Sequence, residues 1–306
     1  MKMLDDWFLI ANPFSNSGKA SKVVQKVAKE LDRVGVEFKI NLTSYPGEEI
    51  VLVDKATSNG YSRILAVGGD GTAQKVVAGI ILQKNIPRNK ILFSLIPCGT
   101  GNDWAKSKRI PVDLSKNIKL LKNGKVKKQD VGVAKIINKK YKRKRFFITY
   151  SGVGFDSFML KEISKYKWLG RFSYTACALM NFTRYRNIPV NINSTKNQIE
   201  ANIFLLGIGI CKYTGGGMQL IKSPNGNDGL LNITIAQDFS KFDIIRNFFN
   251  LFNGAIFKER KVLTVTAKSV RIVAKNGSLV CQGDGEIFGA GKIEYSVIKD
   301  GLRYLC

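Results

Sequence analysis

The chain has 306 residues, of which 44% are hydrophobic and 24% charged, enough for two domains with ordinary cores. It contains no histidine, which excludes Ser-His-Asp and Cys-His catalysis, and its five scattered cysteines argue against a disulfide framework or a zinc site. The net charge of +26 indicates an anionic partner (a polyphosphate, a nucleic acid or an anionic membrane) or a lysine-rich solvated surface.

The first 125 or so residues alternate short apolar runs with segments of helical spacing. Near-continuous apolar runs are typical of strands buried on both faces, and their alternation with helices predicts a parallel, doubly wound sheet. Ligands bind such sheets at the carboxyl ends of the strands. The predicted strands are Trp7–Ala11, Glu37–Leu42, Arg63–Val67 and Ile91–Ile96, and the predicted helices are Ser21–Val34, Glu48–Ser58 and Thr72–Leu82.

The pattern changes near residues 126–134 to strand-like segments separated by turns, which predicts an antiparallel β-sandwich or barrel. We expect domains at 1–130 and 131–292, with 293–306 able to return to the first. The predicted strands are Val126–Ile137, Arg145–Val153, Ile199–Cys211, Leu230–Ala236, Lys261–Thr266, Ser269–Ala274 and Ile293–Ile298.

Three other segments of this half are less regular. Ser157–Tyr185 has helical spacing, and Lys139–Arg145 is predicted as a solvated hairpin tip in preference to an anion-binding loop. Phe239–Phe257 is predicted as an amphipathic helix. Its phenylalanines either reach a bilayer or, as we favour, belong to the core.

A glycine-rich turn, Val67–Thr72, follows a predicted strand and opens a helix. Its glycines (Gly68, Gly69 and Gly71) let the backbone approach phosphates, and the helix N-terminus offers unpaired N–H groups. Asp70 is the informative residue, because a carboxylate beside polyphosphate is unfavourable unless it holds Mg²⁺ or accepts a substrate proton. The alternative is a plain strand–helix turn.

A second glycine-rich turn, Pro97–Ala105, follows the next strand, with Asn102 or Asp103 suited to capping a helix. A third loop, Asn12–Lys19, follows the first strand but lacks the leading glycine and the Ser/Thr after lysine of a P-loop. Loops at the ends of consecutive strands belong to one site, so the sequence predicts a phosphate-binding edge.

Together with later motifs, these loops resemble the diacylglycerol kinase catalytic-domain family, which includes bacterial lipid kinases and the sphingosine and ceramide kinases. The resemblance covers essentially the whole chain and implies an ATP-binding α/β domain followed by an antiparallel β-sandwich or barrel domain. The later motifs are Gln129–Gly132, Leu169–Tyr174, Gly215–Gly217, Pro224, Asp228–Leu231 and Gly283–Glu286.

The resemblance also implies ligand contacts. ATP would contact Asn12, Ser17, Gly18, Thr43, Gly69, Asp70, Gly71, Thr72 and Thr100; from the turns themselves we add Gly68, Asn102 and Asp103. Asp70, Asp103 and Asp130 would organise Mg²⁺ and water, and a structural cation would be bound by the Asp228 side chain and the carbonyls of Asn225 and Leu230.

The catalytic base has three candidates. The resemblance favours Glu286, with Asp284 and Asp70 as alternatives, and Gly283–Glu286 could equally be a polar hairpin turn. The chain departs from the family at Gln74 and Lys75, where relatives commonly carry Asn and Glu; this change could alter nucleotide orientation or metal dependence.

These features predict a Mg²⁺- and ATP-dependent kinase acting on a lipid hydroxyl in phospholipid biosynthesis. The alternatives are a kinase of the NAD-kinase or phosphofructokinase type, or a non-catalytic nucleotide- or nucleic-acid-binding protein of the same fold. We expect ATP and a lipid at an anionic membrane surface as partners, no nucleic acid, and a homodimer as one compatible arrangement. No apolar run reaches the about 18 residues of a membrane-spanning helix, so we expect a cytoplasmic, peripherally associated protein.

Overall fold

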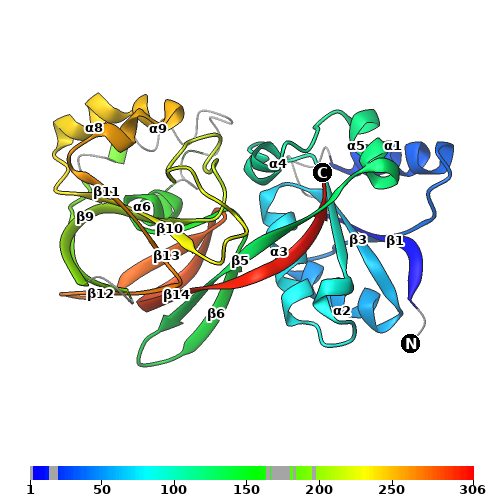
Figure 1. The fold of residues 1–306 in the computed structure, drawn as a ribbon, viewed down its shortest axis with the longest axis horizontal. Coiled ribbons are helices and arrows are strands. Elements are labelled where there is room, and N and C mark those ends of the chain that lie inside the picture. The colour runs from blue at the N-terminus through cyan, green and yellow to red at the C-terminus, as the bar shows by residue number, and fades with distance from the viewer. Residues whose placement is uncertain (1–2, 14–19, 163–165, 167–179, 182–183, 195–197) are drawn as a thin grey trace. The chain divides into compact units, whose positions relative to one another are not determined.

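The computed structural model describes residues 3–13, 20–162, 166, 180–181, 184–194 and 198–306. The chain forms two compact units: residues 1–131 with 299–306 make the first unit, and residues 132–298 make the second. Two long strands, β5 (Val126–Ile137) and β14 (Glu286–Leu305), carry the chain from one unit into the other (Figure 1).

The first unit is built on a parallel sheet of order β2-β1-β3-β4, and the end of β14 joins it by pairing Tyr304 with Phe93 of β4. The apolar runs of β1, β3 and β4 are buried as predicted for a sheet covered on both faces, whereas β2, at the edge of the sheet, has no buried residue. The strands are β1 (Leu4–Ala11), β2 (Phe38–Leu42), β3 (Tyr61–Gly68) and β4 (Leu92–Pro97).

Helices pack against this sheet in two pairs. Alternate residues of β1, such as Trp7 and Leu9, share a core with Leu31 of α1 and Leu121 of α5, while α2 packs against α3. The doubly wound arrangement expected from the alternating pattern is confirmed. The helices are α1 (Ala20–Arg33), α2 (Glu48–Ser58), α3 (Asp70–Leu82), α4 (Asp103–Lys108), α5 (Leu114–Asn123) and the 3-10 turn η1 (Arg88–Lys90).

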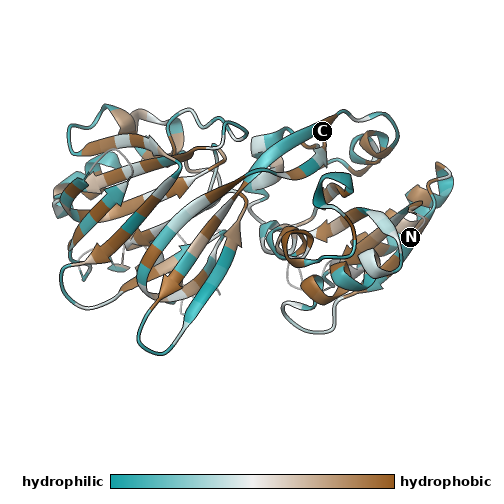
Figure 2. Cartoon of the chain, turned by 60° about the horizontal axis from the view of Figure 1, so that its bottom comes forward, coloured by the Kyte–Doolittle hydropathy of each residue, from teal (hydrophilic) through white to brown (hydrophobic). Residues whose placement is uncertain are grey.

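The second unit is a closed antiparallel barrel. Six strands pair in the ring β9-β7-β13-β14-β12-β8 and back to β9, and the β5–β6 hairpin and the β10–β11 pair extend it. Hydrophobic and hydrophilic residues alternate along these strands (Figure 2), as expected when one face lines a core. The strands not yet given are β6 (Lys142–Phe147), β7 (Tyr150–Gly154), β8 (Ile188–Ser194), β9 (Gln198–Gly209), β10 (Leu231–Gln237), β11 (Val262–Ala267), β12 (Ser269–Ala274) and β13 (Leu279–Gly283).

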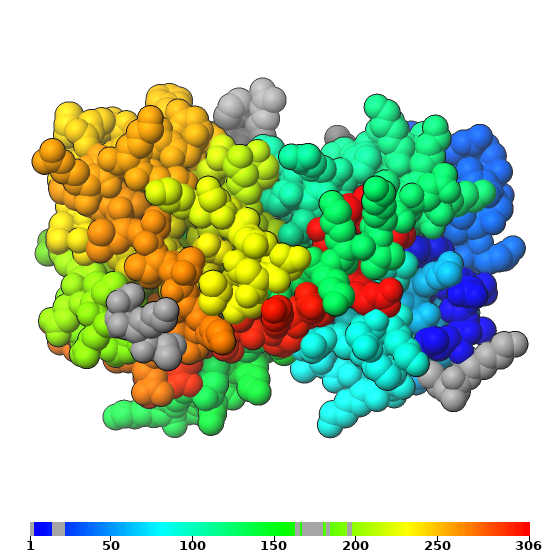
Figure 3. All heavy atoms as spheres, viewed as in Figure 1, coloured from blue at the N-terminus to red at the C-terminus, as the bar shows by residue number. Residues whose placement is uncertain are grey.

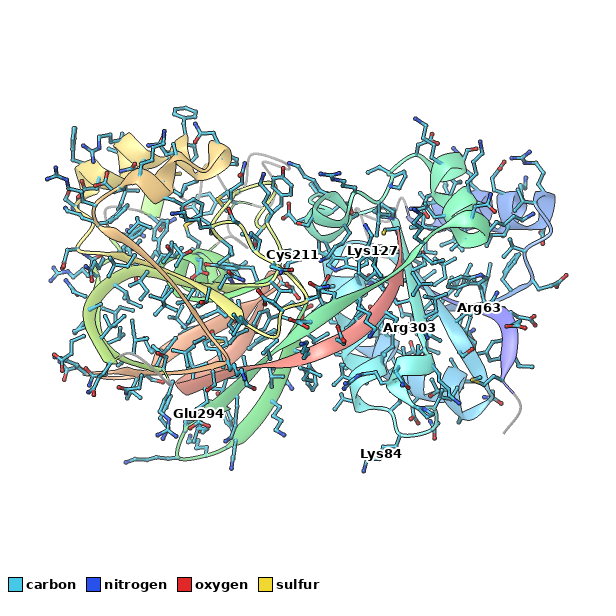
Figure 4. The ribbon with its side chains drawn as sticks, in the orientation of Figure 1. Arg63, Lys84, Lys127, Cys211, Glu294 and Arg303 are labelled. Atoms are coloured by element: carbon cyan, nitrogen blue, oxygen red, sulfur yellow. The ribbon has the colours of Figure 1, made fainter. Side chains whose placement is uncertain are left out.

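Two ion pairs made by one glutamate link three strands, β5, β12 and β14. The Glu294 carboxylate on β14 lies 2.8 Å from Lys135 of β5 and 2.9 Å from Arg271 of β12. The hydrogen bond from Lys135, aided by the nearby cations, lowers the pKa of Glu294. Figure 4 labels this residue on β14.

Two predicted elements of the second half are wrong in detail. Arg145–Val153 is not one strand, because β6 ends at Phe147 and β7 begins at Tyr150. Phe239–Phe257 is not one helix but three short ones, α8 (Lys241–Asn247), α9 (Asn250–Asn253) and the 3-10 turn η3 (Ala255–Lys258). Gly254, at a φ of 77°, ends α9.

The two remaining irregular segments differ in how much of them the structure describes. Of the predicted helical segment Ser157–Tyr185, α6 (Phe155–Glu162) is described, and most of the rest lies outside the described residues. The basic run Lys139–Arg145 does lie in a hairpin, where Asn138 Oδ1 accepts the amides of Lys140 and Tyr141 at 2.8 and 2.9 Å. Within the described residues, no helix combines the length and apolar character needed to span a bilayer.

Candidate active site

The two glycine-rich turns of the first unit touch each other. β3 ends at Gly68 and β4 at Pro97, and the Cys98 amide donates to the Gly68 carbonyl at 3.0 Å. A Cβ placed on Gly99 would lie 2.6 Å from the Cα of Gly69, closer than real Cβ atoms approach backbone. The predicted loops are therefore brought together at the carboxyl edge of the sheet, as the parallel topology requires.

Asp70 joins these turns through its carboxylate. Its Oδ2 accepts the amide of Asp103 at 3.1 Å, and its Oδ1 accepts the amide of Trp104 at 3.0 Å. Asp70, from the first turn, therefore caps α4, which follows the second turn. Asn102 does occupy the N-cap position of α4, as expected, but its side chain makes no capping hydrogen bond and instead exchanges two hydrogen bonds with the Gly99 backbone.

The three aspartates predicted to organise Mg²⁺ and water lie in two different places: Asp70 and Asp103 lie at the glycine turns, and Asp130 lies beside the end of β14. Asp70 and Asp103 both approach Gly101, whose added Cβ would lie 3.2 and 3.6 Å from their Oδ2 atoms. Asp130 is fully buried, and its Oδ1 accepts the Asp300 amide at 2.8 Å, which holds the returning end of β14. Among the described residues, no three or more acidic or cysteine side chains gather closely enough to hold a metal ion.

The other predicted nucleotide contacts vary in accessibility. Thr72 is buried, because its side chain lies over Gly68, and Thr43 is buried with its amide bonded to the Ala11 carbonyl at 2.9 Å. Asn12 is half-buried at the end of β1, and Thr100 is exposed. Gly71 is half-buried in the first turn of α3, and Ser17 and Gly18 lie outside the described residues.

The two departures from the family motif lie one turn further along α3. Gln74 is buried, whereas Lys75 is half-buried. The positive charge introduced by the departure therefore sits on a side chain that solvent reaches, close in sequence to the Asp70 turn.

The turn at the end of β13 in the second unit is a two-residue hairpin turn. Gly283 pairs with Glu286, and Asp284 and Gly285 between them have φ angles of 48° and 84°. Positive φ at both positions is the conformation that Asp-Gly hairpin turns favour. The turn thus has the geometry of the polar hairpin considered from the sequence, whatever chemistry it also supports.

The Asp284 carboxylate is directed at backbone. It accepts the amides of Ile148 (2.7 Å), Thr149 (2.9 Å) and Tyr150 (3.1 Å), and also the Thr149 hydroxyl. Burial raises the pKa of Asp284 to about 6, against these hydrogen bonds, which lower it. Three consecutive amides turned to one carboxylate cannot pair with a neighbouring strand, which explains the break between β6 and β7.

Glu286 differs from Asp284 in its surroundings. It is the first residue of β14 and is half-buried. Solvent therefore reaches part of this side chain, which lies two residues beyond Asp284.

A polar group next to this turn escaped the sequence reasoning. Gln282 Nε2 donates to Asp156 Oδ2 at 2.8 Å, and Gln282 Oε1 accepts the Gly285 amide at 3.4 Å, so Gln282 links the turn to Asp156. Burial raises the pKa of Asp156, and burial followed by the nearby Asp156 charge raises those of Tyr150 and Tyr185. The available signal was a glutamine directly after the apolar run Leu279–Cys281.

The predicted cation loop holds its acid close to the backbone. Asp228 is exposed, and its Oδ1 accepts the Leu230 amide at 2.9 Å. Asn225 is exposed in the same loop. The donor set is all oxygen, which fits Mg²⁺ or Ca²⁺, but it offers one carboxylate, so a cation here would be bound by Asp228, backbone carbonyls and water.

Comparisons with known proteins cover both units. Residues 6–134 match the diacylglycerol kinase catalytic domain, and residues 149–306 match the YegS C-terminal NAD kinase beta sandwich-like domain. The chain is 27% identical over 281 residues to the diacylglycerol kinase of Mycobacterium tuberculosis, covering 90% of this chain and 87% of that protein. It is 26% identical over 271 residues to the "Probable lipid kinase YegS-like" of Pseudomonas aeruginosa, covering 88% and 84%.

Solved structures agree on the fold. A crystal structure from Bacillus anthracis str. Sterne matches with a TM-score of 0.79 at 22% identity, covering 98% of this chain and 97% of that one. A crystal structure of a diacylglycerol kinase from the same strain matches with a TM-score of 0.72 at 20% identity, covering 98% and 96%. With its catalytic domain followed by its YegS-type barrel, the chain belongs to the diacylglycerol kinase catalytic-domain family and is a lipid kinase.

Proposed function

We propose that the protein transfers the γ-phosphoryl group of ATP, with Mg²⁺, to a hydroxyl group of a lipid such as diacylglycerol. The observation that carries the proposal is the contact between the two glycine turns, with the Asp70 carboxylate bound to the first amides of α4. This arrangement presents glycine backbone and an acid at the carboxyl ends of neighbouring parallel strands, which is where open α/β sheets bind phosphorylated ligands.

The chain's residues have distinct roles in this reaction. The backbone of residues 68–71 and 98–101 binds and orients the phosphates, because glycine carries no side chain over its backbone groups, and Gly69, Gly71, Gly99 and Gly101 are half-buried or exposed. Asp70 holds the two turns in one geometry and, with Asp103, offers carboxylate oxygens to Mg²⁺. When bound, Mg²⁺ neutralises charge on the phosphate oxygens.

A carboxylate accepts the proton of the lipid hydroxyl, since the chain has no histidine. We assign this role to Glu286, because the family resemblance of Gly283–Glu286 places the proton acceptor at this position. Asp284 is the weaker candidate, because its carboxylate already accepts three amides and a hydroxyl. Asp70 is also weaker, because each of its oxygens accepts an amide.

The test is transfer of label from γ-labelled ATP to an acceptor in mixed micelles, with and without Mg²⁺. The acceptors are diacylglycerol, a sphingoid base and phosphatidylglycerol, with NAD and a sugar phosphate representing the other kinase classes. Asp70→Asn and Glu286→Gln run beside the matched control Asp32→Asn, an exposed acid at the end of α1. We expect label in a lipid with the unmodified protein and the control only. Label in NAD or the sugar phosphate alone would contradict the proposal.

A further inference from the structure

Helices α8 and α9 of the second unit carry apolar side chains on two opposite sides. One set, Ile244 and Leu251, packs inward against a core that contains Phe239 and Ile256. The other set faces water. Because a single helix needs one apolar stripe to dock on a core, the second stripe is surplus to folding.

The outward set forms one continuous strip, which we call the apolar face. Its members follow one another at intervals of three, four and three residues, the spacing of one side of a helix. Their exposed fractions are 70% for Phe242, 57% for Ile245, 78% for Phe249 and 42% for Phe252. Among the described residues, Phe242, Phe249 and Phe252 are the only exposed phenylalanines. The segment lies at the molecular surface, at the upper left of Figure 3.

The acids of this segment are turned away from the apolar face. Asp243 is buried and lies 2.7 Å from Lys261, and it closes a capping box with Ser240. The hydrogen bonds from Lys261 and Ser240 lower the pKa of Asp243 to about 2. Glu259 is paired with Arg246 and accepts from Asn247 at 3.3 Å.

Basic side chains are exposed in the same segment. Lys241 precedes Phe242, Lys258 is the last residue of η3, and Arg260 follows it two residues later. Residues 240–260 therefore expose cations and large apolar groups, while both of their carboxylates are neutralised internally. Exposed aromatic side chains flanked by cations are typical of segments that lie in the interface of an anionic bilayer.

We propose that the apolar face of α8 and α9 docks on the surface of an anionic lipid bilayer, with Phe242 and Phe249 entering the interface. This proposal rests on the proposed function only for the reason to dock, because a lipid acceptor resides in a bilayer. Docking itself does not require phosphoryl transfer. The charge of the segment favours this occupant over a protein partner, because the exposed charged side chains within residues 240–260 are all basic: Lys241, Arg246, Lys258 and Arg260.

The test measures partition onto sucrose-loaded vesicles of phosphatidylglycerol or phosphatidylcholine, with neither nucleotide nor acceptor lipid present. We expect the unmodified protein to favour phosphatidylglycerol and Phe242→Ser/Phe249→Ser to bind at least about tenfold more weakly. Val51→Ser/Val112→Ser is the matched control, because these valines are comparably exposed, at 56% and 64%, on the first unit. Lys241→Gln/Lys258→Gln should weaken binding to phosphatidylglycerol and reduce its salt dependence.

A second readout does not depend on a destabilising change. Phe249→Trp should be quenched by brominated phosphatidylglycerol, whereas Val112→Trp should not. Equal partition of the serine variants and the unmodified protein, or equal quenching of the two tryptophan variants, would overturn the proposal. Loss of self-association in Phe242→Ser/Phe249→Ser without loss of vesicle binding would instead assign the face to a second copy of the chain.

Kinase assays separate this proposal from the proposed function. Phe242→Ser/Phe249→Ser should lose turnover on vesicle-borne lipid and keep it on lipid dispersed in detergent micelles. If no lipid accepts label in any form while vesicle binding still depends on the apolar face, the proposed function fails and the docking surface stands.

Discussion

The chain contains the tripeptide Gly-Asp-Gly twice, and the two copies are used differently. Gly69–Gly71 lies at the end of a parallel strand, where Asp70 accepts two consecutive amides from the neighbouring turn. Gly283–Gly285 lies in a hairpin of the barrel, where Asp284 accepts three consecutive amides and a hydroxyl. In both copies the aspartate organises backbone that is distant in the sequence.

The difference lies in what the carboxylate leaves available. Asp70 is half-buried where the two glycine turns pack against each other, and we expect it to support a ligand while holding the turns. Asp284 binds three consecutive amides and a hydroxyl, and Glu286, the residue after the turn, begins β14 and is half-buried. The motif therefore predicts a backbone-organising acid at both places, but a ligand-facing acid at only one.

The largest effect should come from the residue beside the second copy. Glu286→Gln should lower turnover by about 10²–10⁴-fold, the contribution of a general base. Its unfolding free energy should fall by less than that of Asp284→Asn, because the Asp284 carboxylate holds three amides and a hydroxyl. Label transfer and urea denaturation measure the two, with Glu200→Gln, an exposed acid on β9, as the control. Native turnover in Glu286→Gln would remove it as the base.

Asp284→Asn should act on stability first. Its amide group would place N–H donors against the amides of Ile148–Tyr150, so we expect a loss of about 3 kcal/mol in unfolding free energy. Thr149→Val, which removes only the hydroxyl bond, should cost about 1 kcal/mol. A variant Asp284→Asn that is as stable as the native protein yet inactive would show that this carboxylate serves catalysis.

Asp70→Asn should be less damaging to the fold than Asp284→Asn. One of the two amides of Asp103 and Trp104 would lose its acceptor, which predicts a loss of about 1–2 kcal/mol in unfolding free energy. Nucleotide affinity should fall as well, because the turns lose their shared tie. Calorimetric titration with ATP and urea denaturation measure both. Unchanged stability would mean that Asp70 does not cap α4 in solution.

The last prediction concerns the pH dependence of stability. Because burial raises the pKa of Asp284 from about 4 to about 6, the folded protein keeps a proton that the unfolded chain has lost between these values. The stability advantage of the native protein over Asp284→Asn should therefore be full below pH 4 and shrink as pH rises through about 6. Denaturation at a series of pH values measures this difference in stability, and carboxyl NMR follows the titration of Asp284. Titration of the Asp284 carboxyl below pH 4 would contradict the prediction.

Regular alternation made the first half predictable from its sequence. The bounds of α2 agree with the predicted helix Glu48–Ser58, and the strands differ by a few residues at their ends. A strand with a continuous apolar run avoids water only when both faces of its sheet are covered. The run therefore predicts both the strand and its place inside a sheet covered by helices. The glycine turns follow from the same logic, because parallel strands end at a shared edge.

The second half was harder because its periods are irregular. Strand β8 (Ile188–Ser194) was missed because its apolar residues are interleaved with proline and asparagines, and β13 because the run is short and ends in Gln282. The segment Phe239–Phe257 is apolar on two sides, so its sequence could not say which set of phenylalanines packs inward. The favoured reading, that they all belong to the core, is wrong for Phe242, Phe249 and Phe252.

Local sequence determined the helices and strands and the residue types of the site. These are glycine turns after buried strands, with acids inside them, and no histidine is present as an alternative acid or base. Tertiary structure alone decided which groups those acids meet. Asp70 binds amides 33 and 34 positions away, and Asp284 binds amides 134 to 136 positions away. Hydrogen bonds of this kind depend on where the packed strands place the backbone amides. The spacing of residues along the chain does not predict which amides lie beside which carboxylate.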